Sequence, residues 1–379
     1  MQDFEARQIA NMLHAMAKAH YRPANGTFVS ELERHAETVI GLFCAQDLAN
    51  TLWAYATMKC QPGKGLMRAL EGQTEAIAGT FNAQEVANTL WAYATMGLEP
   101  GEGVMRGLEG RAEAVAGTFH AQGVANTLWA YATLGRVPGK GLMRELEGRA
   151  EEVAETFNAQ GVVNMLWAAS VFSTLCASQE ERRWVQVVTQ RLVSLSKPEC
   201  FKRDGLRQLH QFFVWCRLEE KQGVGWCRQV LNDVPALPDA CREAFVRTEA
   251  TASATQRQVS QTLVRMGLSV EVEARCPTSG YSIDMLVHDS AGAMGGERSN
   301  GGGKWTVEYD GPSHFLASRA PTGATLLKRR HLQLLGHALV SVSYWEWDAL
   351  GRGVSDESSQ CEREREEYLR GKLVAVTPF

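Results

Sequence analysis

The 379-residue chain has room for two or three domains, and its 45% hydrophobic composition is enough to build their cores. Its formal net charge of −4 gives no overall basic signature, which weakens a nucleic-acid function without excluding one, since local patches matter more than totals. No apolar run approaches the roughly 18 residues needed to span a membrane, so no membrane association is expected.

Cysteine usage and the start of the chain bear on the compartment. Nine cysteines occur without a CxxC pair, which indicates a reducing compartment and no zinc site. Met1 leads almost directly into repeat-like sequence with acidic Asp3 and Glu5, so no secretory or transit peptide is visible. On this ground the protein is expected to be cytosolic or nuclear, or the chain to be a fragment of a longer precursor.

The first part of the chain is an internal repeat. The phrase NTLWAYAT occurs at 50–57, 88–95 and 126–133, and the clear units begin at 38-residue intervals, at Phe43, Phe81, Phe119 and Phe157. A weaker unit opens the chain at Phe4, with His14 in the tryptophan position, and another begins at Phe201. A fixed period of this length predicts a solenoid, here over residues 1–245.

Each unit is predicted to be a pair of helices. Asn82 is followed three residues later by Glu85, the pattern of a capping box, and Gly97 supplies a stop after the next apolar face. Pro100 marks the entry to a second helix. Glycines weaken that second helix by about 1 kcal/mol each relative to alanine, so stacking between repeats must supply its stability.

Two positions recur in every clear unit, a tryptophan and an asparagine. The tryptophans are Trp53, Trp91, Trp129 and Trp167. The simplest interpretation is a core spacer between stacked repeats, and the alternative is an exposed ladder that stacks on bases. The asparagines are Asn50, Asn88, Asn126 and Asn164. Their amides either hydrogen-bond between helices or line a groove and contact a ligand.

After about residue 245 the repeat ends, and residues 246–379 are predicted to form a small α/β domain. The expected order is a helix at 248–268, strands at 269–276 and 281–289, a glycine-rich excursion at 290–303, a strand and turn at 304–315, a basic helix at 325–337, a strand at 338–350 and a helix at 357–373.

Four blocks carry a family resemblance. VEYDGPSHF, LKRRHLQLLG, VSVSYWEW and YLRGKL follow one another between residues 307 and 373, and this order resembles a RAP domain covering about residues 253–373. The 38-residue units are similar to octotricopeptide repeats, which algal organelle RNA proteins combine with a RAP domain, and the FAST-kinase-like family shares a helical-repeat body. The units have PGKGL or PGEGV where octotricopeptide repeats often have a Pro-Pro-Pro-Glu-Trp-like segment, so detailed base-reading rules do not carry over.

The resemblance also implies a candidate metal site, because RAP domains are similar in fold to PD-(D/E)XK nucleases. In such sites carboxylates at strand ends bind Mg²⁺, which activates water. Asp284, Glu308 and Asp310 are the expected ligands, with His314 as acid, base or phosphate contact. The nuclease pattern has a lysine at the position that Asp310 occupies here, and Lys328 of the following helix is the candidate substitute.

Alternatives compete for the same residues. Asp310 is equally expected to form a turn by bonding its own backbone, with His314 as a structural residue. The basic run, which contains Lys328, Arg329 and Arg330, either contacts RNA phosphate or forms a solvated face. We favour a degenerate nuclease fold retained for RNA binding over an active nuclease.

Three functions therefore remain open. The first is an RNA-binding factor in mitochondrial or chloroplast RNA processing, stability or translation, with single-stranded RNA and other RNA-processing proteins as partners. The second is a Mg²⁺-dependent endonuclease. The third is a protein-binding scaffold, since α-solenoids bind peptides as readily as nucleic acids and architecture alone does not choose among them.

Overall fold

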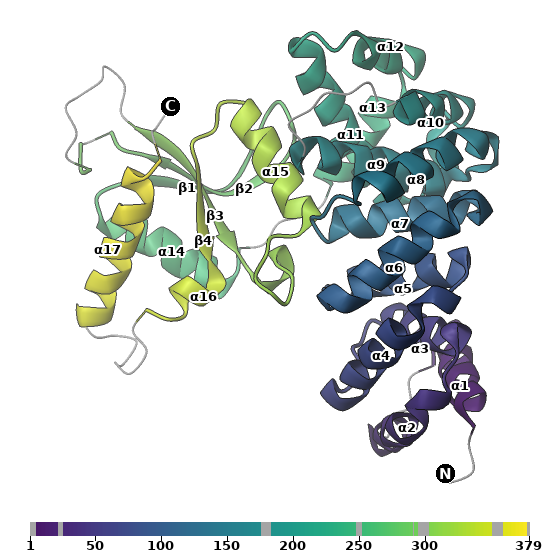
Figure 1. The fold of residues 1–379 in the computed structure, drawn as a ribbon. Coiled ribbons are helices and arrows are strands. Elements are labelled where there is room, and N and C mark those ends of the chain that lie inside the picture. The colour runs from purple at the N-terminus through teal and green to yellow at the C-terminus, as the bar shows by residue number, and fades with distance from the viewer. Residues whose placement is uncertain are drawn as a thin grey trace. The chain divides into compact units, whose positions relative to one another are not determined.

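The computed structural model describes residues 5–21, 26–175, 183–247, 252–290, 292–294, 303–350 and 359–376. The chain forms two compact units (Figure 1). The first comprises Met1–Leu209 with Leu316–Gly323, and the second His210–Phe315 with Ala324–Phe379. This division falls inside helix α11 (Arg203–Lys221), ahead of the boundary expected at residue 245.

The first unit is an array of helix pairs. Its helices are α1 (Ala6–Lys18), α2 (Gly26–Val39), α3 (Ala45–Thr57), α4 (Lys64–Ile77), α5 (Ala83–Met96), α6 (Glu102–Ala114), α7 (Ala121–Thr133), α8 (Lys140–Glu152), α9 (Ala159–Leu175) and α10 (Arg183–Ser194). The odd-numbered helices pack on one another in chain order, and so do the even-numbered helices from α2 to α10. The predicted α-solenoid is confirmed, and the weak first repeat forms the full pair α1–α2.

The predicted capping residues act as caps. Glu85 N–H donates to Asn82 Oδ1 at 2.9 Å, and Asn82 N–H donates to Glu85 Oε2 at 2.8 Å. At the other end of α5, Gly97 adopts a left-handed φ of 67°, a conformation that glycine reaches without steric cost. Helix α6 then starts after Gly101, as the proline before it predicts.

Side chains of one repeat bond to the next. The Tyr131 hydroxyl donates to Glu109 Oε2 at 2.7 Å, and Gly139 N–H donates to Glu109 Oε1 at 3.1 Å. Within one repeat, Arg149 Nε donates to the Phe119 carbonyl at 2.7 Å. The equivalent contacts elsewhere are Tyr55 with Glu33 between repeats, and Arg111 with Phe81 within a repeat. The bonds to the glutamates supply part of the inter-repeat stabilisation that the glycine-rich second helices lack.

In the first helices of three repeats a tyrosine is fully buried, whereas the neighbouring tryptophan is only partly buried. The tyrosines two positions after the tryptophans are fully buried, at Tyr55, Tyr93 and Tyr131. The first three tryptophans, Trp53, Trp91 and Trp129, are only half-buried. The core-spacer interpretation is confirmed for Trp167, which is 4% exposed, and it stays a prediction for the three partly exposed tryptophans.

The second unit combines three helices with an α/β layer structure. Its elements are α11, α12 (Gly225–Asp233), α13 (Leu237–Val246), α14 (Ala254–Arg265), β1 (Ser269–Arg275), β2 (Ser282–His288), β3 (Lys304–Asp310), α15 (Gly323–Leu334), β4 (Leu339–Ser343), α16 (Tyr344–Trp347) and α17 (Ser359–Val374). The sheet order is β1-β2-β3-β4, with the first two pairings antiparallel and β3–β4 parallel. The small α/β domain is confirmed, although residues 344–347 form a helical turn instead of continuing the strand.

Each face of this sheet is covered by helices. Met285, Val307 and Val340 point to the face covered by α14 and α17. Leu286 and Leu339 have the opposite strand parity, and they pack against the cluster that contains Leu332 of α15. Figure 1 shows α15 on one side of the strands and α14 and α17 on the other. Most of the predicted glycine-rich excursion at 290–303 lies outside the described residues.

Helices α11 and α13 join the sheet through a buried aromatic cluster. His210 Nε2 lies 2.7 Å from the Ser279 carbonyl, and the Tyr281 hydroxyl lies 3.1 Å from His331 Nδ1. Phe245 of α13 packs edge-on against Tyr281. Burial lowers the pKa of His210 to about 4 and that of His331 to about 3, so both imidazoles are neutral in the folded unit. Within the described residues, no helix is long and apolar enough to cross a membrane.

Candidate functional site

A stripe of polar and aromatic side chains runs along the free face of three consecutive first helices. Each helix presents a glutamine, an asparagine four residues later and a tryptophan three residues after that, a spacing that places them on one helix face. The members of this Gln–Asn–Trp stripe are Gln46, Asn50 and Trp53 on α3, Gln84, Asn88 and Trp91 on α5, and Gln122, Asn126 and Trp129 on α7. The glutamines are exposed, and the asparagines and tryptophans are half-buried.

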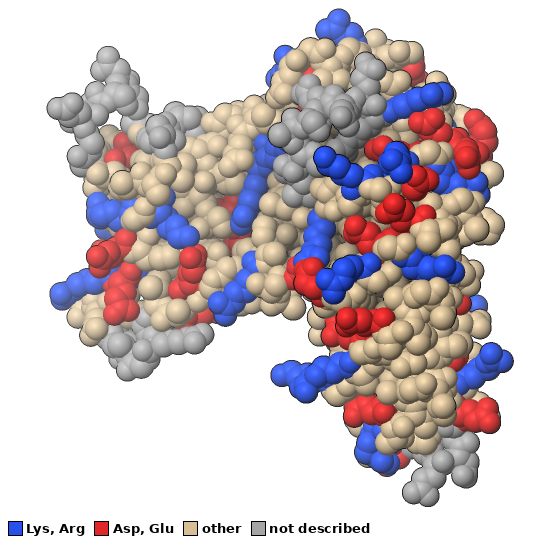
Figure 2. Space-filling view, in the orientation of Figure 1, with Lys and Arg blue, Asp and Glu red and all other residues tan. Residues whose placement is uncertain are grey.

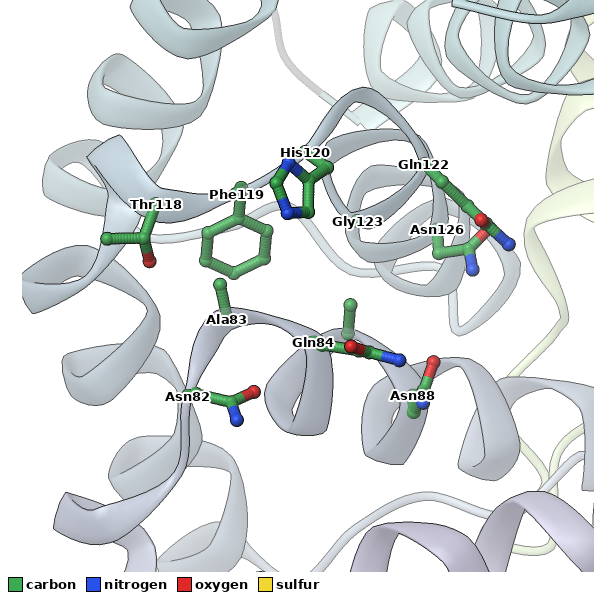
Figure 3. Close-up of a pocket in the computed structure, with 11 residues that line it drawn as sticks. Asn82, Ala83, Gln84, Asn88, Thr118, Phe119, His120, Gln122, Gly123 and Asn126 are labelled. Atoms are coloured by element: carbon green, nitrogen blue, oxygen red, sulfur yellow. The ribbon is translucent and has the colours of Figure 1, made fainter. Parts of the chain in front are cut away.

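A groove of about 420 Å³ separates the first turns of α5 and α7. It is lined by Gln84, Asn88, Gln122 and Asn126, and Figure 3 shows these four amides gathered toward one end, with Phe119 toward the other. Within the described part of the chain, no residue hydrogen-bonds to the Asn88 or Asn126 amide. The groove-lining alternative therefore describes these two asparagines better than an inter-helix ladder does.

The stripe changes at both ends. His14 of α1 takes the tryptophan position, and its ring centroid lies 4.8 Å from that of Trp53. In α9, Asn164 is 6% exposed and Trp167 is 4% exposed. Gln160 Nε2 donates to Asn164 Oδ1 at 2.8 Å, so this amide is already bonded within its own helix. A ligand contact by Asn164 stays a prediction, and its burial does not favour it.

The stripe carries no cationic side chain. Helices α3, α5, α7 and α9 contain neither lysine nor arginine, whereas α4, α6 and α8 are rich in both signs of charge. Figure 2 shows acidic and basic side chains interspersed over the visible face of this unit. Amide groups and indole rings contact bases or peptide groups, but they cannot neutralise phosphates.

The second candidate region lies in the C-terminal unit, where the predicted carboxylates share a face of the sheet. The β2–β3 register pairs Met285 with Val307, which sets Asp284 beside Glu308. Residues two apart on a strand point the same way, so Asp310 lies on this face too. The face is the one covered by α15. The structure therefore brings together the three acidic residues that strand alternation predicted.

Lysine reaches this face from α15. Lys328 Nζ lies 2.5 Å from Glu308 Oε2, and the other carboxylate oxygen of Glu308 is buried without a hydrogen-bond partner. Burial raises the pKa of Glu308 to about 7, although the Lys328 charge acts in the opposite direction. Burial would lower the pKa of Lys328, but the charges of Glu308 and Asp284 outweigh it and raise that pKa. Asp284 accepts a hydrogen bond from Tyr309 N–H at 2.8 Å.

Both oxygens of Asp310 are engaged by other side chains. Arg329 Nη2 lies 2.6 Å from Oδ2, the Ser341 hydroxyl donates to the same oxygen, and His314 Nδ1 lies 2.9 Å from Oδ1. Burial acts to raise the pKa of Asp310, but the bond with His314 and the Arg329 charge outweigh it and lower that pKa. The alternative in which Asp310 bonds its own backbone is therefore wrong. His314 contacts this carboxylate, and its role as acid, base or phosphate contact stays a prediction.

The basic run on α15 is paired with carboxylates throughout. Arg330 Nη2 lies 2.9 Å from Glu219 Oε1 of α11, which complements the pairs made by Lys328 and Arg329. The solvated-face alternative is therefore wrong for this run, and phosphate contact by these cations stays a prediction. Glu219 is the partner that the sequence did not indicate, since 111 residues separate it from Arg330.

The metal assignment also stays a prediction. Among the described residues, no group of three or more His, Cys, Asp or Glu side chains is arranged to hold a metal ion. We define the ion-pair cluster as Asp284, Glu308, Asp310, His314, Lys328 and Arg329. Because both oxygens of Asp310 bond to protein donors, Asp284 and Glu308 are the carboxylates of this cluster that remain for a metal ion. Mg²⁺ is often held by one or two carboxylates with waters and substrate phosphates completing its shell, so these two retain a suitable chemistry.

Comparison with known proteins finds a family match in each part of the chain. Residues 307–372 match the model of the RAP domain, and residues 2–178 match that of the RNA-editing substrate-binding complex 6 protein. The chain is 32% identical over 119 residues to the chloroplastic RAP domain-containing protein of Oryza sativa subsp. japonica, a stretch that covers 31% of this chain and 15% of the rice protein. The C-terminal RAP domain is therefore confirmed, whereas the octotricopeptide assignment of the repeats stays a prediction.

Proposed function

We propose that the Gln–Asn–Trp stripe of the solenoid binds single-stranded RNA through its bases, and that the protein is an RNA-binding factor in organelle RNA processing, stability or translation. The observation that carries this proposal is the stripe itself, on a solvent-facing row of helices. Each of its three helices presents one glutamine, one asparagine and one tryptophan, and we call each such set a rung. Unstacked RNA bases are recognised in this way, by stacking on aromatic rings and by hydrogen bonds to their edges.

The names of the related proteins also support RNA binding in an organelle. The family matched by the solenoid is named for an RNA-editing substrate-binding complex, and the rice relative is named as a chloroplastic protein. These names favour RNA as the ligand, an organelle as the location and association with other RNA-processing proteins.

The rungs are chemically identical, which constrains what they recognise. If one rung contacts one base, three rungs with the same glutamine, asparagine and tryptophan should accept the same base three times. We therefore expect preference for a homopolymeric tract, in contrast to repeat proteins whose varied side chains read a varied sequence. Recovery of a complex, non-repetitive motif by in-vitro selection would contradict this expectation.

The direct test is a fluorescence-anisotropy titration of the full chain with labelled single-stranded homopolymers at low salt. Stacking contributes about 1 to 3 kcal/mol per base and each amide hydrogen bond about 0.5 to 1.5 kcal/mol, so three rungs together should give dissociation constants below about 10⁻⁵ M for the preferred tract. No binding at that concentration to any homopolymer would overturn the proposal and favour a protein-binding scaffold.

A second candidate function is a Mg²⁺-dependent endoribonuclease, and one observation favours it. Lys328 supplies, from α15, the lysine that is missing from the strand, and it lies 2.5 Å from Glu308. Asp284 and Glu308 would hold the metal, which would polarise a phosphodiester and activate water. Asp284→Ala and Glu308→Ala should abolish any Mg²⁺-dependent cleavage while leaving RNA affinity nearly unchanged. Robust cleavage by the wild-type chain, lost in both variants, would place this function ahead of RNA binding alone.

A further inference from the structure

A separate pocket lies within the C-terminal unit and contains no member of the ion-pair cluster. It is formed by α11, α12, the turn between β1 and β2, and the residue that follows α15. Its volume is about 380 Å³, which falls near the lower end of the range for small-ligand sites. The pocket is thus large enough for one compact organic ligand.

Three cations and one carboxylate line this pocket. Arg228 Nε lies 2.7 Å from Glu220 Oε1, so these two charges offset each other. Arg217 and Lys221, one turn apart on α11, form no ion pair with any carboxylate that the structure describes. The pocket therefore has two uncompensated positive charges, and charge complementarity calls for an anionic ligand carrying up to two negative charges.

The remaining wall is apolar. Val214 and Leu218 of α11 are 4% and 5% exposed, and Leu335 closes the pocket from the end of α15. An inorganic anion would leave this surface unused, whereas a flat heterocyclic base would bury it. A cationic rim beside an apolar wall suits a nucleotide, which has an anionic phosphate at one end and a flat base at the other.

The wall opposite α11 is held in place before any ligand arrives. Arg242 donates to the carbonyls of Thr278 and Pro277 at 3.0 and 2.7 Å, and Gly280 N–H donates to the Cys276 carbonyl at 2.8 Å. These bonds fix the β1–β2 turn, whose Thr278 lines the pocket. A preformed site loses less conformational entropy when a ligand binds.

We propose that this pocket binds a nucleoside monophosphate, with the phosphate on Arg217 and Lys221 and the base against Val214 and Leu218. A free nucleotide and the phosphorylated end of an RNA present the same chemistry. The proposal stands independently of the Gln–Asn–Trp stripe, because no residue of the stripe lines this pocket.

The test is isothermal titration of the full chain with adenosine 5′-monophosphate, adenosine and inorganic phosphate. We expect one site per chain, with the monophosphate binding at least tenfold more tightly than either fragment. Arg217→Gln and Lys221→Gln should each weaken monophosphate binding about tenfold or more, since a hydrogen bond to a charged group is worth that much. Arg363→Gln removes the same charge from the exposed face of α17 and should leave the affinity unchanged. Lys221 is exposed, so its variant tests the pocket even if Arg217→Gln fails to fold.

No binding at millimolar monophosphate, equal affinity for inorganic phosphate, or equal losses in Lys221→Gln and Arg363→Gln would each overturn the proposal. Competition by 5′-phosphorylated and 5′-hydroxyl dinucleotides then separates the two sources. Preference for the phosphorylated dinucleotide over the free nucleotide assigns the pocket to an RNA end, and the reverse order assigns it to free nucleotide. Monophosphate binding should persist when the asparagines of the stripe are replaced, which keeps failure of this proposal distinct from failure of RNA binding by the solenoid.

Discussion

Acidification from pH 7 to pH 5 should destabilise the C-terminal unit, because two histidines in its core are held neutral. His210 and His331 are fully buried, and burial lowers their pKa values to about 4 and about 3 from an ordinary 6.5. As the pH falls below 6.5, the unfolded chain takes up protons at these residues and the folded chain does not, so stability is lost. At 1.36 kcal/mol per pKa unit, each histidine lowers the free energy of unfolding by about 2 kcal/mol between pH 7 and pH 5.

Glu308 acts in the opposite direction over the same interval. Burial raises its pKa from 4.5 to about 7, so the folded chain holds a proton that the unfolded chain releases. Lowering the pH from 7 to 5 therefore adds about 2 kcal/mol of stability from this residue. The two histidines and Glu308 together should therefore lower the free energy of unfolding by about 2 kcal/mol, the difference between the two effects. Glu308→Gln removes the offset, so its acid loss should exceed that of the wild type by about 2 kcal/mol.

Hydrogen exchange measured as a function of urea resolves the two units and so provides the assay. Peptides from β2 and β3 report the free energy of unfolding of the C-terminal unit at each pH, and peptides from α5 and α7 report the solenoid separately. Unchanged stability of β2 and β3 between pH 7 and pH 5 would refute the assignment of neutral buried histidines. A smaller acid loss in Glu308→Gln than in the wild type would refute the raised pKa of that carboxyl.

Three further outcomes follow from the solenoid. Tyr131→Phe removes a hydrogen bond to a carboxylate between repeats and should cost about 1.5 to 3 kcal/mol in urea unfolding, whereas Tyr21→Phe, at a side chain 58% exposed, should cost almost nothing. Gly107→Ala should destabilise α6, because the new Cβ would lie 2.8 Å from Ala78 Cβ, whereas Gly110→Ala meets nothing within 4 Å and should stabilise the helix by up to about 1 kcal/mol. RNA affinity should depend weakly on salt, with a logarithmic slope equivalent to fewer than about two phosphate contacts, since the stripe is uncharged; a slope several times steeper would show that phosphates dominate binding.

The regular features of the fold could be predicted because they are local. Asn82, Glu85 and Gly97 specify the ends of α5 within sixteen residues, and the 38-residue period shows that the same solution recurs. Strand alternation likewise places Glu308 and Asp310 on one face without reference to the rest of the chain. These predictions hold since hydrogen bonds and side-chain direction within one element decide them.

The features that were missed depend on contacts between distant elements. Whether Trp91 or Tyr93 fills the core depends on how neighbouring helices are rotated, which the composition of one helix does not reveal, since both residues lie in the same apolar phrase. The pairing of Arg330 with Glu219 requires α11 to pack beside α15. The sequence therefore predicted a solvated or RNA-binding face for the basic run, although each of its cations has a buried carboxylate partner.

The most direct test of the central claim compares RNA binding by two matched triple variants. One replaces Asn50, Asn88 and Asn126 of the stripe by alanine, and the other replaces the exposed arginines at equivalent positions of the second helices, Arg68, Arg106 and Arg144, by glutamine. At about 0.5 to 1.5 kcal/mol per hydrogen bond, the asparagine variant should lose at least about tenfold in affinity for the preferred single-stranded RNA, with its salt dependence unchanged. The arginine variant should bind nearly as the wild type does. Full affinity in the asparagine variant, together with a large loss in the arginine variant, would contradict base recognition by the Gln–Asn–Trp stripe.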